Sequence, residues 1–157
     1  MRKRSKYRPK GVIVDTMRHV ITGMQRLDDA DSRHHALTLR LKNHASLEAM
    51  FKGEGTRDDI DVLIASMNVA EALAIHGLGD QFRAEITAAQ NAIYAMSRRG
   101  IERQRFLFTG PEMQQMREGM EVHDAQLDAC TVAQLERALS FVEREIRAKR
   151  ARSIAAA

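Results

Sequence analysis

The chain has 157 residues, the size of one ordinary domain, which is enough to bury a hydrophobic core without disulfides or metal ions. Hydrophobic residues make up 44% and charged residues 29%, and no apolar run approaches the roughly 18 residues that a membrane span needs. The charged N-terminus lacks the apolar core of a signal peptide, and the single Cys130 can form no internal disulfide. The composition therefore predicts a cytoplasmic protein without a membrane partner.

The net charge of +4 hides an uneven distribution along the chain. Six Lys and Arg residues and no acid lie in the first ten residues, and four more cations lie between residues 147 and 152. Subtracting these ten from the 25 cations leaves 15 against 21 acids, so residues 11–146 carry a net charge of −6. An acidic body with basic ends differs from a uniformly basic nucleic-acid domain, and any polyanion binding is expected at the ends.

The N-terminal part is predicted to be an arm followed by a short helix. Residues 1–14 begin as a basic segment, in which Pro9 disfavours helix, and we expect this arm to be disordered or extended. Asp15 is suited to cap a helix that stops in the acidic run at 28–32. Its apolar residues recur at helical spacing: Ile13, Met17, Val20, Ile21 and Met24.

Two further helices follow in the first half of the chain. The second is predicted from about Ser32 to Phe51, with its best apolar stripe at Leu37, Leu41 and His44. The run from Thr56 to Asp59 resembles a capping box and predicts the start of a third helix. That helix is expected to stop at Gly77, a residue suited to a left-handed C-cap.

Three more helices are predicted in the second half. Asp80 is expected to cap a fourth helix that ends at Gly100, with the stripe Phe82, Ile86, Ala89, Ile93 and Met96. Residues 101–108 fit a short strand, an extended linker or a helical turn. Capping boxes begin a fifth helix at Thr109 and a sixth at Thr131. Their stripes are Met113, Met116, Met120, His123 and Leu127, then Leu135, Ala138, Leu139, Val142 and Ile146.

These elements predict an all-α fold, a compact bundle of about six helices joined by short loops. The expected organisation is a basic arm over residues 1–14, a helical domain over 15–150 and a frayed tail over 151–157. The nine Met residues and the absence of Trp predict a core of aliphatic and Met side chains.

The basic arm is the strongest local feature of the sequence. Cations on an extended segment release counterions when they contact phosphates, and an aromatic ring among them can stack on a base. The alternative is a solvated tail, or one that docks on the acidic body. The candidate residues for binding a nucleic acid or another polyanion are Arg2, Lys3, Arg4, Lys6, Tyr7, Arg8 and Lys10.

No motif predicts catalysis, a metal site or a cofactor. The six His residues include no pair at zincin spacing, and a second Cys for a structural zinc site is missing. His123, near Glu121 and Asp124, is expected to be a buried structural residue. Only a fold that brought His44 or His19 beside it would favour a metal. Cys130 is expected to be a small core residue.

The segment Phe106, Leu107 and Phe108 has two interpretations. Three consecutive large apolar residues must be buried, either in the local core, which we favour, or in a contact with a partner or a second copy. The stripe of Met113, Met116 and Met120 carries the same choice between core and binding surface.

Four segments resemble a group of small uncharacterised proteins of tailed bacteriophages and of prophages of proteobacteria. They are RKRSKYRPKGV near the start, RDDIDVLIASMNVAEAL in the middle, and FLFTGPEMQQM and MEVHDAQLDACTVAQLERAL later in the chain. The resemblance covers nearly the whole chain. It implies a phage-encoded accessory protein in the bacterial host cytoplasm, of a kind that modulates host machinery, regulates phage genes or blocks antiviral defence, and it carries no catalytic residues.

Three functions are therefore open, in the order binding module, inhibitor, enzyme. The first is a non-enzymatic protein whose arm binds nucleic acid or another phosphate-bearing partner. The second is an inhibitor of a host antiviral defence system or host protein, acting by direct protein binding or, as a homo-oligomer, by sequestering a nucleotide signal. The third is a metal-dependent enzyme acting through His123.

Overall fold

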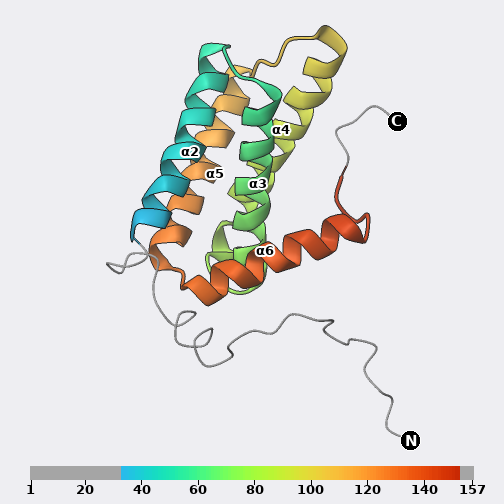
Figure 1. Ribbon diagram of the computed structural model, residues 1–157. Coiled ribbons are helices and arrows are strands. Elements are labelled where there is room, and N and C mark those ends of the chain that lie inside the picture. Colours follow the sequence, from blue (N-terminus) through green and yellow to red (C-terminus); the bar gives the residue numbers. More distant parts are fainter. Residues whose placement is uncertain (1–32, 153–157) are drawn as a thin grey trace, which may run out of the picture.

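The computed structural model describes residues 33–152 of the chain, and these residues fold into helices without strands. Figure 1 shows α2, α3, α4 and α5 packed side by side, with α6 lying across one end. The bounds of the helices are α2 Arg33–Lys52, α3 Arg57–Ile75, the short 3-10 helix η1 Asp80–Phe82, α4 Arg83–Arg103, α5 Gly110–Ala129 and α6 Val132–Arg147. The all-α prediction is confirmed, and five of the six predicted helices are present. The first, predicted after Asp15, lies outside the described residues.

Helix α3 is the centre of the bundle. It contacts α2, α4, α5 and α6, and nine of its residues are buried. One of its sides contributes Leu63, Met67 and Ala70 to a large core shared with α2, α4 and α5. The other side contributes Val69 and Leu73 to a smaller core under α6. Burial on both sides explains why α3 is the most continuously apolar helix of the chain.

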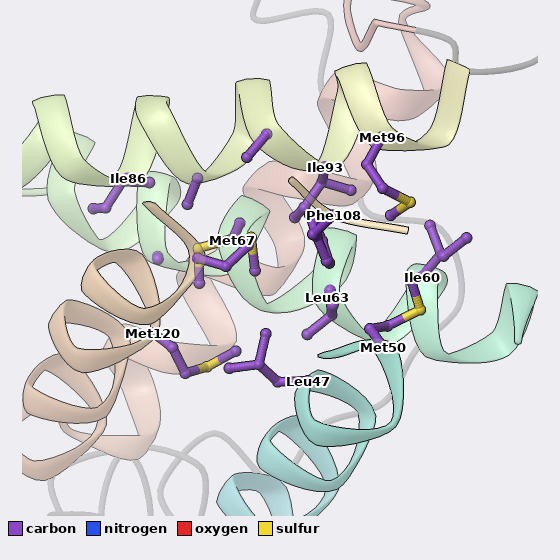
Figure 2. Packing of buried hydrophobic residues seen from close by; sticks show 14 of the residues in the cluster. Leu47, Met50, Ile60, Leu63, Met67, Ile86, Ile93, Met96, Phe108 and Met120 are labelled. Carbon is purple, nitrogen blue, oxygen red and sulfur yellow. The ribbon is translucent and has the colours of Figure 1, made fainter. Parts of the chain in front are cut away.

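The large core is filled with methionine, as the composition predicts. Figure 2 shows Met50, Met67, Met96 and Met120 converging from four helices around Leu63. Each of these side chains is at most 1% exposed. Unbranched Met side chains adapt to the irregular spaces between crossing helices, which suits a core that has few aromatic rings.

A glycine in the middle of α5 sets the distance between helices. A Cβ at Gly119 would lie 2.5 Å from the Cβ of Ala89 on α4 and 3.0 Å from the sulfur of Met67 on α3. Only glycine therefore permits α5 to approach both neighbours this closely. The gain in packing offsets the lower helix propensity of glycine.

The capping boxes at Thr56, Thr109 and Thr131 are all present, with side chain and backbone bonded reciprocally in each. At Thr56 the reciprocal acceptor is Asp59, whose carboxylate accepts from the Thr56 amide at 2.8 Å. An Asp therefore serves where Glu or Gln is usual. Gly77 has the predicted left-handed conformation, with φ of 94°.

The start of the fourth helix was predicted wrongly. Residues Asp80–Phe82 form η1, and Phe82, which makes no side-chain cap, precedes the first residue of α4. Phe82 is also 43% exposed, whereas Ile86 and Met96 on the same predicted stripe are buried. The 3-10 turn changes the angle between successive residues, and it rotates Phe82 out of the line of the α-helical stripe.

The end of the fourth helix was also predicted wrongly, because α4 continues past Gly100 to Arg103. A side chain at Gly100 would overlap the ring of Phe106, so this glycine serves a close contact. The turn falls instead at Gln104, which has φ of 53°, and the Arg105 amide donates to the Gly100 carbonyl at 3.1 Å. Residues 104–109 then run without helix or strand to α5.

A partly buried ion pair holds this connection in place. Arg99 on α4 donates to both carboxylate oxygens of Glu112 on α5, at 2.8 and 2.6 Å, and to the Leu107 carbonyl at 3.1 Å. Glu112 also accepts from the Thr109 amide at 2.8 Å, and its side chain is only 13% exposed. The hydrogen bonds from Arg99 lower the pKa of Glu112 below its usual value. One carboxylate thus joins α4, the connection and α5.

Replacing Glu112 with Ala is expected to lower the free energy of unfolding by about 2–3 kcal/mol, because Arg99 would stay half-buried without its partner. Replacing Thr109 with Ala removes only the cap and should cost about 1 kcal/mol. Urea denaturation at pH 7 measures both, and Ser140→Ala on the exposed side of α6 is the control with almost no change. Equal losses for Glu112→Ala and Thr109→Ala would contradict the bridging role.

Candidate functional site

Polar side chains gather between α2 and α5, and we call this set the α2–α5 polar cluster: Arg40, His44, His123, Asp124 and Asp128. Arg40 donates to the Asp124 carbonyl at 3.0 Å and pairs with the carboxylate of Asp128. The Nε2 of His44 lies 2.7 Å from Oδ2 of Asp124. Arg40 and His44 are four residues apart, as are Asp124 and Asp128, so each helix presents two polar residues one turn apart.

Several atoms of the cluster are buried without a protein partner. They are Arg40 Nε, His123 Nδ1 and Asp124 Oδ1. A buried polar group without a hydrogen bond costs about 1–3 kcal/mol, so three at one helix interface are unusual for a site that serves packing alone. The α2–α5 interface is therefore the part of the described structure with the greatest unused hydrogen-bonding capacity.

His123 is the most deeply buried member of the cluster, with only 1% of its surface exposed. Burial lowers its pKa from 6.5 to about 4, although the neighbouring Gln126 and Asp124 oppose this effect. Arg40 and His44 add a smaller effect in the same direction as burial. The imidazole is therefore neutral at pH 7, and the prediction of a buried His123 is confirmed.

The chemistry open to the cluster is limited by its geometry. A His–Asp pair such as His44 and Asp124 can orient a base for proton transfer, yet a nucleophile at its outer nitrogen is also needed. Cys130 does not supply one, because it is fully buried and lies 3.9 Å from the Leu127 carbonyl. Within residues 33–152, no three His, Cys, Asp or Glu side chains are arranged to hold a metal ion. His44 thus faces Asp124 rather than forming a metal site with His123.

Sequence reasoning identified only part of this cluster. It singled out His44, His123 and Asp124, but it missed Arg40 and Asp128, which were not marked by any motif. The available signal was spacing, since Arg40 lies one turn before His44, and Asp128 lies one turn after Asp124. Pairing with a particular residue of α5 depends on the crossing of the two helices, which the sequence does not reveal.

The segment 106–108 lies in the local core. Phe108 is 6% exposed and meets Phe51 edge-on with ring centroids 5.9 Å apart. Phe106 packs against the same core, and Leu107 lies beside Gly53. Met116 and Met120 are also buried, whereas Met113 is partly buried against the same core, so most of both sets lies in the core. A partner contact through the half-buried surfaces of Phe106 and Leu107 stays a prediction.

The predicted polyanion-binding residues, Arg2 to Lys10, lie outside the described residues. The C-terminal cations are described, and three of them are engaged by the body. Arg147 pairs with Glu143 at 3.6 Å, and Arg150 pairs with Glu145 at 2.6 Å. Arg152 donates to Asn91 at 2.9 Å and lies over the ring of Tyr94 on α4. Arg147 and Arg150 thus pair with acids of α6 while staying largely exposed, and Arg152 contacts α4.

The free energy of unfolding should fall as the pH is lowered from 6.5 to 4. In this range His123 binds a proton in the unfolded chain but stays neutral in the folded chain. The pKa difference corresponds to a loss of up to about 3 kcal/mol, complete once the pH is below about 4. Urea denaturation at pH 7 and 4.5 measures this loss, and His123→Leu should remove most of it. His76→Leu is the control that should keep it. An unchanged pH dependence in His123→Leu would contradict the assignment.

In residues 33–152, none of the helices combines the length and the apolar character that a membrane crossing demands. Comparisons of the chain with protein-family models, with curated proteins and with solved structures give no match.

Proposed function

We propose that this protein is a non-enzymatic binding protein whose basic arm, residues 1–10, engages nucleic acid or another phosphate-bearing partner. The observation that carries the proposal is the charge of the arm: six cations and no acid, attached to a body with a net charge of −6. Phosphate contacts by such a segment release counterions, which provides affinity without requiring a shaped pocket. Tyr7 can add stacking on an unpaired base.

The ion pairs of the body support the assignment of polyanion binding to the arm. Cations there lie beside acids of the same body, as in Arg99 with Glu112, Lys52 with Glu48 and Arg83 with Glu71. Such pairing reduces the field that these cations present to a polyanion. The first ten residues, in contrast, contain no acid that could neutralise the cations of the arm.

The resemblance to small phage proteins suggests where this binding would take place. Together with the charge pattern, it leads us to infer a phage-encoded accessory protein that acts in the cytoplasm of a bacterial host. Its phosphate-bearing partner would then be phage or host nucleic acid.

Removing residues 1–10 should abolish most of the affinity for DNA and flatten its salt dependence. Each lost phosphate contact lowers the slope of log K against log salt by about 0.9 on duplex DNA, so six contacts would lower it by about 5. Fluorescence anisotropy with duplex and single-stranded DNA at rising NaCl concentrations gives this slope.

A matched substitution separates the arm from total charge. Arg2, Lys3 and Arg4 changed together to Gln should reduce affinity and slope, whereas Lys42, Arg103 and Arg105 changed to Gln should have little effect. These last three are exposed cations of the body, so both triple variants lose the same charge. Equal effects of the two variants, or an unchanged slope without the arm, would reject the proposal.

A second candidate function, an inhibitor that binds a host protein directly, is favoured by the surface of α6. In Figure 1 this helix extends beyond the helices that it crosses. Leu139 and Ile146 on it are 47% and 54% exposed, whereas Ala138 is buried in the smaller core under this helix. A shallow groove on the same helix is lined by Ala133, Glu136, Arg137, Leu139, Ser140 and Arg144. An open, partly apolar helix face suits a protein partner better than a nucleotide.

The double substitution Leu139→Lys and Ile146→Lys should leave the fold intact and abolish capture of a specific host protein from bacterial lysate. Ser140→Lys with Ala148→Lys is the matched control, because it also replaces two exposed neutral residues near the apolar ones and adds the same charge of +2. Capture by both variants at the level of the natural chain would count against the α6 surface.

A further inference from the structure

Helix α2 has apolar residues on two opposite sides. Leu47 and Met50 face the bundle and are 6% and 0% exposed. Leu37 and Leu41, one turn apart, are 54% and 62% exposed. At 100° per residue, Leu37 lies about 140° around the helix from Met50. We call Leu37, Leu41 and the exposed Ala45 the outer face of α2.

A helix that is apolar on two sides usually lies between two packing partners. The inner side of α2 already contacts α3 and α5. Figure 1 shows α2 at the edge of the group formed by the described helices, with none of them beyond it. A single exposed Leu would be ordinary on a protein surface, but two adjacent ones followed by Ala form a continuous strip.

We propose that the outer face of α2 is the docking site for residues 15–27 of the same chain, which pack on it as an antiparallel helix. The sequence of this segment supplies what the strip lacks, an apolar stripe at helical spacing: Met17, Val20, Ile21 and Met24. Only the polar residues 28–32 separate the segment from α2, and so short a connection makes consecutive helices antiparallel neighbours.

The spacing of the two stripes agrees with this arrangement. Met24 lies three residues before the end of the segment, and Leu37 lies four residues after the start of α2. Ile21 and Leu41 lie six and eight residues from the same ends. At about 1.5 Å per residue, the two members of each pair reach nearly the same height along an antiparallel pair.

A second copy of the chain could use the same strip, but attachment favours the chain's own segment. A short linker gives the tethered segment an effective concentration in the millimolar range, far above that of a second molecule in dilute solution. At low protein concentration, residues 15–27 of the same chain are therefore expected to occupy the outer face of α2.

Cysteine labelling tests the docking directly. With Cys130→Ala to remove the buried natural thiol, Leu41→Cys places a single reactive group on the outer face of α2. We expect its reaction with a maleimide to be at least tenfold slower in the full chain than in a chain that begins at residue 28. Glu121→Cys on the exposed side of α5 is the matched control, whose rate should be the same in both chains.

Substitutions within the segment identify the surface that docks. Ile21→Asp in the full chain should raise the labelling rate at position 41 toward that of the shortened chain, whereas Thr22→Asp, one position off the stripe, should not. Circular dichroism of both variants verifies that the remaining helices stay folded.

The other outcomes are distinguishable. Equal labelling rates at position 41 with and without residues 1–27 would overturn the proposal, because the strip would then be open in both. Protection that grows with protein concentration and accompanies a doubled mass in light scattering would also overturn it, since a second copy would then cover the strip. Protection that is independent of concentration and lost in Ile21→Asp is the expected result.

Discussion

Burial of α3 on several sides is the constraint from which the described structure is built. Leu63 and Met67 on one side and Val69 and Leu73 on the other must all leave water, and a single neighbouring helix cannot cover both sides. Helices α2, α4 and α5 therefore surround the first side, while α6 closes the second. The crossing position of α6 follows, since it packs against the C-terminal half of α3 at one end of the bundle (Figure 1). The outer half of α6 is consequently left with exposed apolar residues.

Polar contacts then determine how the helices connect around this centre. Gln126 donates to the carbonyls of Ala70 and Leu78, both at 2.9 Å, and so ties α5 to α3 and to the turn that follows it. Glu112 performs the corresponding task at the other end of α5, where it binds Arg99. These two side chains fix both ends of α5 by directional bonds, whereas the Met-rich core between them is adaptable.

The sequence predicted the local features better than the faces of the helices. Capping at Thr56, Thr109 and Thr131 depends on residues within three positions, so these starts could be recognised without the fold. The predictions at Gly100 and Asp80 were wrong because contacts from elsewhere in the fold decide the structure there. Phe106 packs against Gly100, and a 3-10 turn begins at Asp80. The stripe of Leu37 and Leu41 on α2 was recognised as apolar, but the buried side of the helix instead carries Asn43 and Ser46 beside Leu47.

The candidate site was predictable to a similar extent and for the same reason. His123 could be assigned to the core because it continues the stripe of Met116 and Met120 on one helix. Its neighbours Arg40 and His44 come from a helix some 80 residues earlier, and no periodicity links the two. The apolar pattern within one helix can be seen in the sequence. Which residues meet across an interface depends on how the two helices cross, and the sequence of neither helix gives this.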